Sequence, residues 1–140
     1  LVSNLEGCKR EEWQEANREL AAAVVERFIH LIATVSPGAK LGSTAAYSRS
    51  ECVLVEVGSA QPRTLANAFR KPVEKVPDLL ANTYHAMANY VKDLDHVYET
   101  GEERRLSATG DTKTLTDALQ IEKAAPLSET ASWAASQVRG

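Results

Sequence analysis

The segment Cys52–Val57 constrains the fold of this chain more than any other part of the sequence. Five of its six residues are apolar, and three of them are valine. That composition is typical of a strand that is buried on both faces, inside a sheet rather than at its edge. A strand of this kind needs hydrogen-bonded neighbours, so the position of those neighbours in the sequence decides the fold class.

A long amphipathic helix precedes this strand. Apolar residues at spacings of three and four predict it from about residue 10 to residue 35, with charged residues such as Glu19 and Arg27 on its solvated flank. Pro37 and Gly38 end the helix, because proline disfavours a helical conformation in the residue before it and glycine lets the chain reverse. The predicted apolar stripe consists of Trp13, Ala16, Leu20, Val24, Phe28, Leu31 and Val35.

Two segments are candidate neighbours of the buried strand. Leu41–Tyr47 is a moderate strand candidate and Ser48–Glu51 a plausible turn, so a hairpin with Cys52–Val57 is the simplest interpretation. Alternation of residue types also predicts a short strand over Arg104–Ala108.

Helices account for most of the remaining chain. Pro62 and Pro77 each suit the first turn of a helix, because proline loses no hydrogen bond there. Thr114 and Asp117 match a capping box. The predicted helices are a short one over Arg63–Phe69, a long one over Val76–Tyr98, a brief one from Thr114 to Ile121, and a terminal one over Leu127–Val138 that buries Trp133 and Val138. The stripe of the long helix comprises Val76, Leu80, Thr83, Met87, Tyr90, Leu94 and Val97.

This order of elements predicts an α+β fold of the ferredoxin-like or RRM-like kind, in which two long helices pack on a small antiparallel sheet and a helical tail follows. Only one strand is convincing, and a two-stranded sheet is not stable by itself. Leu1–Leu5 also resembles the end of a strand, and the sequence does not start with methionine. We therefore expect residues 1–140 to form one partial domain of a longer protein.

Composition excludes several classes of protein. A chain of 140 residues with 44% hydrophobic and 25% charged residues is ordinary for a globular domain, and no apolar run reaches the roughly 20 residues of a membrane span. Cys8 and Cys52 have no partner spacing, so neither a zinc site nor a disulfide framework is indicated, and the default location is the cytoplasm. The net charge of −3 argues mildly against a free-standing nucleic-acid binder.

No pattern of residues predicts an enzyme, a metal site or a cofactor site. Gly38–Thr44 superficially matches a phosphate-binding loop, but Lys40 precedes the Gly-Ser-Thr and a helix, not a strand, comes before it. His85 and His96 are three helical turns apart, too far to share a metal, and His30 is expected to be half-buried. Cys52 fits a small buried hydrophobic residue.

A few basic residues are candidates for a surface that binds a polyanion, although by composition alone each charge is more often an ordinary solvated residue. They are Lys40, Arg49, Arg70, Lys71, Arg104 and Arg105. Lys40 is open to two interpretations, a solvated loop lysine or a contact to a phosphate. The interleaved aromatic residues of RRM base-stacking strands are missing near the hairpin, where Tyr47 is the single aromatic residue.

Four stretches of the sequence, taken together, resemble a known family. They are Arg27–Lys40, Thr44–Tyr47, Val53–Val57 and Leu65–Phe69. In this order they are similar to the C-terminal part of CasC, the backbone subunit of the type I-E Cascade complex, an RNA-guided CRISPR surveillance assembly. The similarity extends over residues 10–73 and weakens beyond them.

The resemblance implies a right-hand-shaped subunit with an RRM-like palm, whose copies polymerise along a CRISPR RNA. It implies that this chain is the C-terminal part of that palm, without the N-terminal strand, the fingers and the thumb. On this basis we expect Lys40 to contact an RNA phosphate and Ser43 and Thr44 to add hydroxyl or amide donors, while Leu65–Phe69 serves packing. Contacts of this kind are independent of guide sequence, because base pairing does the reading.

The partners implied are the CRISPR guide RNA, further copies of the subunit, other Cascade subunits and, through the guide, target DNA. No catalysis, cofactor or membrane is expected, and the location would be cytoplasmic. The alternative is a small α+β adaptor or oligomerisation module without nucleic acid. The negative charge and the shortage of aromatic residues favour that alternative.

Overall fold

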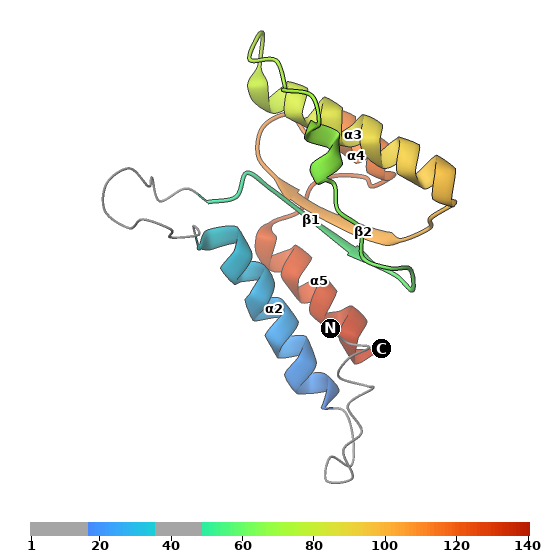
Figure 1. Ribbon diagram of the computed structural model, residues 1–140. Coiled ribbons are helices and arrows are strands. Elements are labelled where there is room, and N and C mark those ends of the chain that lie inside the picture. The colour runs from blue at the N-terminus through green and yellow to red at the C-terminus, as the bar shows by residue number, and fades with distance from the viewer. Residues whose placement is uncertain (1–16, 36–48) are drawn as a thin grey trace. The chain divides into compact units, whose positions relative to one another are not determined.

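The computed structural model describes residues 17–35 and 49–140, and it confirms the α+β class (Figure 1). Within these ranges it contains four α-helices and one antiparallel sheet of two strands. The chain divides into two compact units, a subdivision that the sequence pattern did not predict. We name Glu51–Pro126 the sheet unit. The helix-pair unit contains the chain up to Ser50 together with Leu127–Gly140.

The sheet of the sheet unit joins two strands that are far apart in the sequence. Strand β1 (Cys52–Val57) pairs antiparallel with β2 (Glu103–Ala108), and Leu54 lies opposite Leu106. Both strands were predicted. The hairpin was expected to come from Leu41–Tyr47, which lies outside the described residues. Within the described part of the chain, the neighbour of β1 is β2.

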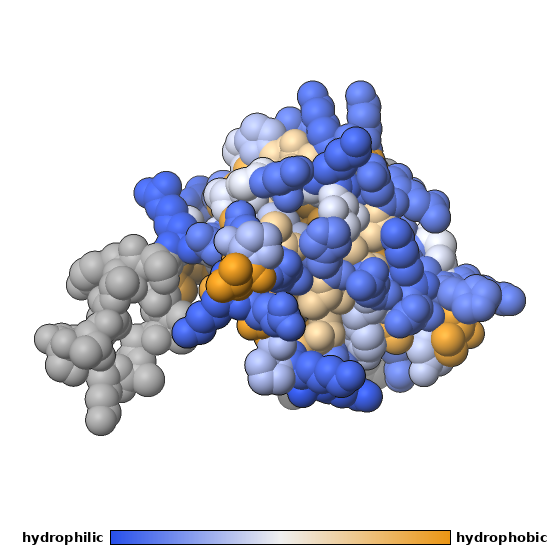
Figure 2. Space-filling view, turned by 90° about the horizontal axis from the view of Figure 1, so that it is seen from above, coloured by the Kyte–Doolittle hydropathy of each residue, from blue (hydrophilic) through white to orange (hydrophobic). Residues whose placement is uncertain are grey.

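One face of this sheet is covered by α3 (Leu79–Tyr98) and α4 (Lys113–Leu119) (Figure 1). Tyr84 anchors the packing, because its buried hydroxyl donates to the carbonyls of Thr109 (2.8 Å) and Glu51 (3.3 Å) at the start of the ladder. Seen from the side of α3 and α4, the surface is mainly hydrophilic, with apolar groups in small separate patches (Figure 2). The buried residues of this core are Tyr84, Ala88, Val91, Leu106, Leu115, Ala118 and Leu119.

Helix α3 begins later than predicted and buries a different stripe. Asp78 is its N-cap and accepts hydrogen bonds from the amides of Leu80 (2.8 Å) and Ala81 (3.2 Å), so Pro77 precedes the helix instead of standing in its first turn. Val76 and Val97, at the two ends of the predicted stripe, are exposed. Apolar residues occur on more than one side of this helix, and packing against β2 selects the side that contains Tyr84.

The shorter helices also differ from their predicted limits. The predicted helix over Arg63–Phe69 is a 3₁₀ turn, η1 (Ala66–Phe69). Helix α4 begins at Lys113, so the predicted capping box starting at Thr114 is wrong. Asp111 instead accepts a hydrogen bond from the amide of Lys113 (3.0 Å) and ends the preceding loop.

The helix-pair unit consists of α2 (Arg18–Thr34) packed against α5 (Leu127–Arg139), which run antiparallel (Figure 1). Arg139 pairs with Glu19 (3.0 Å) and Ser132 donates to Glu26 (3.1 Å). The first of these contacts joins the start of α2 to the end of α5, as the antiparallel arrangement requires. The contact surface is made of small residues, which let the two helix backbones approach closely. Its buried residues are Ala21, Ala22, Ala135 and Val138.

The predicted apolar stripe of α2 is not its buried face. Leu20 is 61% exposed, Phe28 is 56% exposed and Val35 is 60% exposed, whereas Ile29 and Ala33 are buried. The prediction failed because the helix carries apolar residues on two sides, and α5 packs on the side with small residues. On α5 Val138 is buried as predicted, and Trp133 is half-buried. In the described ranges, none of the helices combines the length and the apolar character needed to span a membrane.

Replacing Ala22 by leucine tests the alanine contact. Ala22 is completely buried between α2 and α5, so Ala22→Leu should lower the free energy of unfolding by about 1–3 kcal/mol through overpacking. The neighbouring Ala23 is exposed on the same helix, and Ala23→Leu should leave stability almost unchanged. Urea denaturation followed by circular dichroism measures both variants, and equal effects would contradict the described packing.

Candidate nucleic-acid interface

The predicted RNA contacts Lys40, Ser43 and Thr44 lie outside the described residues, and their role stays a prediction. The structure does describe the two ends of the segment that carries them. At the first end, the amide of Val35 donates to the carbonyl of Leu31 (2.8 Å) as the C-cap of α2. Thr34 donates its hydroxyl to the carbonyl of His30 (2.7 Å), which satisfies a further group of the last turn.

Ser50 holds the second end of the segment against the same turn of α2. Its amide donates to the carbonyl of Ala33 (2.8 Å), and its hydroxyl donates to the carbonyl of Ile32 (3.4 Å). The last carbonyls of a helix have no partner within the helix, so these bonds complete the helix end. Val35 and Ser50 therefore both lie at the last turn of α2.

The basic residues considered for a polyanion surface fall into different environments. Arg49, Arg70 and Lys71 are exposed. Arg104 is not available, because its side chain is only 6% exposed and is bonded to Glu56 and Asp95. Phe69 stands beside Arg70 at the end of η1 and is 42% exposed, so the expected packing role of the Leu65–Phe69 segment is carried by Leu65, which contacts the core.

Four charged side chains form a network at one end of the sheet. Glu56 comes from β1, Arg104 from β2, Asp95 from α3, and Arg63 from the loop after β1. Arg104 binds Asp95 through two nitrogens (both 2.7 Å) and Glu56 through Nε (2.8 Å). Arg63 binds Glu56 (2.6 and 3.0 Å) and Asp95 (3.0 Å). We name these four residues the ion quartet. Its two positive and two negative charges balance.

The quartet stays ionised over the physiological pH range. Burial opposes the charged form of Asp95, but hydrogen bonds from Arg104, Thr100 and Arg63 outweigh it and lower the pKa of Asp95 to about 2. Burial likewise opposes ionisation of Glu56, and the two arginines reverse that effect, so the pKa of Glu56 is lowered. Charge-assisted, bidentate bonds of this kind are the strong ones in proteins. The quartet therefore has a structural role: it holds β1, β2, α3 and the loop after β1 together.

A small hollow of about 150 Å³ lies beside the quartet. Glu56, Arg63, Thr100 and Glu102 line it, together with the segment Gly58–Pro62. The carboxylate of Glu102 lies directly over Gly58, so a β-carbon at this position would require the Glu102 side chain to move. The hollow is smaller than the usual 300–1,000 Å³ of a ligand site.

Other reactive side chains have ordinary surroundings. Burial raises the pKa of the Cys52 thiol to about 11, so it remains protonated at neutral pH, in agreement with the predicted packing role. His30 is half-buried as predicted, and His85 and His96 are exposed on α3. Among the residues that the structure describes, no group of three or more histidine, cysteine, aspartate or glutamate side chains is placed to hold a metal ion.

The quartet was missed by sequence reasoning, although one signal pointed to it. Glu56 is the single charge in an otherwise apolar strand, and a carboxylate in such a place needs a cationic partner. The partner Arg104 could be found only from the register of two strands that are separated by a helix. Arg63 and Asp95 gave no signal of their own.

The fold defines the class first: the chain is an α+β protein, and in its described part the charges of the ion quartet pair with one another. Over residues 1–133 the chain matches the model of a family described as CT1975-like protein, and it belongs to that family of CRISPR-associated (Cas) proteins. The search of the curated proteins found no match. The predicted CRISPR association is thereby confirmed at the level of the Cas family.

Replacing Asp95 by asparagine tests the quartet through pH. Because the pKa of Asp95 is lower in the folded chain than in the unfolded chain, its contribution is complete above about pH 4 and is lost as the pH falls towards 2. That contribution amounts to about 2 kcal/mol, so the wild type should lose this much more stability than Asp95→Asn between pH 5 and pH 2.

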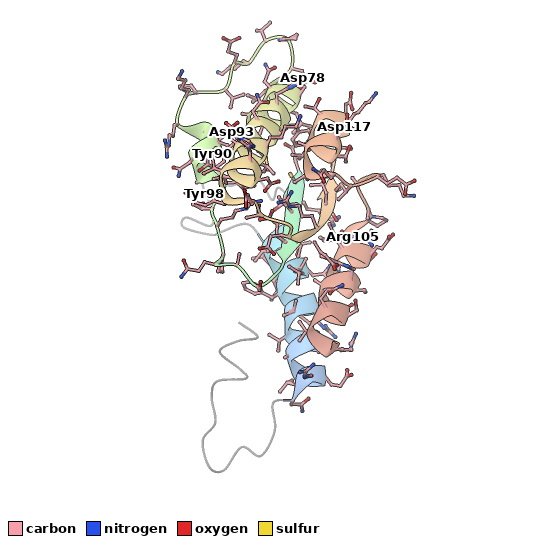
Figure 3. All side chains as sticks on the ribbon, turned by 90° about the vertical axis from the view of Figure 1, so that its right-hand side faces the viewer. Asp78, Tyr90, Asp93, Tyr98, Arg105 and Asp117 are labelled. Carbon is pink, nitrogen blue, oxygen red and sulfur yellow. The ribbon has the colours of Figure 1, made fainter. Side chains whose placement is uncertain are left out.

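The matched control is Asp93→Asn, on the exposed side of the same helix (Figure 3). Asp93→Asn should lose as much stability as the wild type between pH 5 and pH 2. If Asp95→Asn and Asp93→Asn show the same profile in urea titrations at pH 2, 3, 4 and 5, the quartet does not act as described.

Proposed function

We propose that this chain is the C-terminal portion of a non-catalytic backbone subunit of a type I-E Cascade complex, which binds the CRISPR RNA and polymerises along it. The observation that carries the proposal is the match to a family of CRISPR-associated proteins over residues 1–133. Residues 10–73 resemble the CasC backbone subunit in several stretches that follow the same order. This resemblance supports the assignment to a type I-E backbone subunit.

The proposed grip on RNA is electrostatic and independent of sequence. Lys40 supplies a positive charge to a phosphate, and Ser43 and Thr44 supply hydrogen-bond donors. Phosphate contacts position a nucleic acid without reading its bases, which leaves reading to base pairing between guide and target. Ser50, which follows this segment in the sequence after Arg49, is bonded to the carbonyls of Ala33 and Ile32 in the last turn of α2.

The end of α2 cannot supply the grip by itself. Carbonyl groups at a helix C-terminus carry partial negative charge and repel a phosphate. The basic side chains of the ion quartet are also excluded, since their donors are used by Glu56 and Asp95. The proposal therefore places the contacts on Lys40, Ser43 and Thr44, with the exposed Arg49 a few residues further along the chain.

The proposed partners are the guide RNA, further copies of the subunit, the other Cascade subunits and, through the guide, target DNA, all in the cytoplasm. The non-catalytic role is part of the same proposal. The balanced charges of the quartet support it, because a catalytic acid, base or nucleophile must be free to react.

One observation favours the alternative of an adaptor without nucleic acid. The apolar side of α2, with Leu20, Phe28 and Val35, is exposed, and exposed apolar patches mark protein interaction sites. An adaptor would bind a partner protein through this side of α2 and would contain no RNA. The presence or absence of RNA in the purified complex therefore distinguishes the two functions.

The function is tested by purifying the complete gene product together with the products of neighbouring genes and extracting its nucleic acid. The proposal predicts a large complex that contains a discrete RNA of repeat-spacer type. A small monodisperse particle without RNA would overturn the proposal and leave the adaptor as the better explanation.

Replacing Lys40 by alanine tests the predicted contact within that complex. Lys40→Ala should weaken binding equally for guides of different sequence and lower the salt dependence of affinity by about one unit of slope per copy. The control is Lys92→Ala, which removes an exposed lysine from α3. Fluorescence anisotropy at several salt concentrations measures both, and an unchanged slope for Lys40→Ala would identify Lys40 as a solvated loop lysine.

A further inference from the structure

The loop at the C-terminal end of α3 is acidic and borders exposed apolar residues. Glu99, Glu102 and Glu103 are its charged residues, and no hydrogen bond or ion pair to another described residue engages their carboxylates. The last carbonyls of the helix add partial negative charge. Val97 is 67% exposed and Tyr98 is 69% exposed beside this loop (Figure 3). We name these five residues the acidic end.

The backbone at Glu99 indicates that its carboxylate serves a purpose outside the fold. Glu99 follows α3 in the left-handed conformation (φ 49°), which favours glycine at the end of a helix. Its side chain is exposed and forms no bond within the described part of the chain. Residues kept in such conformations are common where a protein binds a partner. The carboxylate of Glu99 is therefore available to one.

The loop that leads into α3 is basic and also borders exposed apolar residues. It contains three positive charges and one negative charge, from Glu74, and all four side chains are exposed. Within residues 17–35 and 49–140, no hydrogen bond or ion pair engages the three cations. Val76 is 76% exposed and Leu79 is 51% exposed. We name the three cations and these two apolar residues the basic end: Arg70, Lys71, Lys75, Val76 and Leu79.

Asn82 holds the basic end beside the first turns of α3. Its side-chain amide donates to the carbonyls of Glu74 (2.9 Å) and Val76 (3.2 Å), which lie on either side of Lys75. A surface that is already ordered loses less conformational freedom on binding than a flexible loop does. The basic end is thus prepared for a contact with a matching surface.

The acidic end and the basic end lie at opposite ends of one helix (Figure 1). Helix α3 has 20 residues and is about 30 Å long, whereas charges more than about 10 Å apart are screened in 0.1 M salt, so the two ends do not neutralise each other within one copy. Each end combines charges of one sign with two exposed apolar side chains. The acidic end of one copy is therefore complementary to the basic end of another.

We propose that copies of this chain associate head to tail, with the basic end of one copy bound to the acidic end of the next. Such a contact joins two different surfaces and leaves one end of each copy free, so it can continue into a chain of copies. The proposal names the surfaces through which copies of the subunit meet, and in this it rests on the proposed function. The contact itself needs no RNA.

A nucleic acid fits these surfaces less well than a second copy does. Its phosphates could pair with the cations of the basic end, but Val97 and Tyr98 would remain exposed at the other end of α3. A second copy covers the apolar residues of both ends and pairs charges of both signs. Binding of nucleic acid at the basic end is therefore the outcome from which the experiment must distinguish the contact.

Two matched variants of the full chain test the proposal. Each removes two charges and one exposed valine from one end, and all the replaced residues are exposed, so the fold should be retained. The control replaces Glu122 and Lys123, exposed residues of the loop after α4, by glutamine. The basic-end variant is Lys71→Gln, Lys75→Gln, Val76→Ser, and the acidic-end variant is Val97→Ser, Glu99→Gln, Glu103→Gln.

Sedimentation velocity on protein freed of nucleic acid measures the average mass over a range of concentrations. The mass of the wild type and of the control should rise with concentration beyond two copies, and 1 M salt should weaken their association about tenfold. Each variant alone should remain a single copy. A mixture of the two variants should form pairs and nothing larger, because each contributes one intact end, and these pairs show that both variants are folded.

Three results would overturn the proposal: a wild type that remains a single copy, a wild type that stops at two copies, or variants that associate as the wild type does. If the wild type stays single and a DNA duplex binds it but not the basic-end variant, the basic end belongs to nucleic acid. RNA extracted from the complete complex would still support the proposed function in each of these cases. Head-to-tail association here without RNA there would overturn that function and leave this contact standing.

Discussion

The bonds between Arg104 and the carboxylates of Glu56 and Asp95 join β1, β2 and α3 at one end of the sheet. Two strands cannot form a stable sheet by themselves, and β1 and β2 are connected only through a helix and its loops. Arg104 joins Glu56 across the ladder and Asp95 on α3, and Arg63 brings in the loop after β1. Tyr84 plays the corresponding part at the opposite end of the ladder, with apolar packing against Leu106 between them.

The helix-pair unit follows a different principle, in which small side chains decide the packing. Helix α2 presents alanines to α5, so the two backbones approach closely and the large residues Leu20, Phe28 and Val35 remain outside. An exposed apolar side of this length is uncommon on a protein that acts alone. The quartet and the alanine contact therefore affect the surface differently. The quartet pairs charged side chains with one another, whereas the alanine contact leaves large apolar side chains of α2 exposed.

The sequence predicted those features that depend on local pattern. Strands β1 and β2, α5 and most of α3 follow from periodicity and composition, and the Cas family was indicated by four short stretches in order. Features that depend on distant residues were not predictable. Asp78 and Pro77 both suit a helix start, and only the fold selects Asp78. Helix α2 has two apolar sides, either of which could have been buried, and packing against α5 decides which one is. The quartet needed the register of β1 and β2, which no local pattern contains.

The arrangement of charges limits where this protein can bind a polyanion. Arg63 and Arg104, two cations of the sheet unit, are held by Glu56 and Asp95, and releasing either would leave a half-buried carboxylate without a partner. A phosphate would therefore have to compete with bonds that are already short and bidentate. The proposed RNA contacts of Lys40, Ser43 and Thr44 therefore make no use of Arg63 or Arg104.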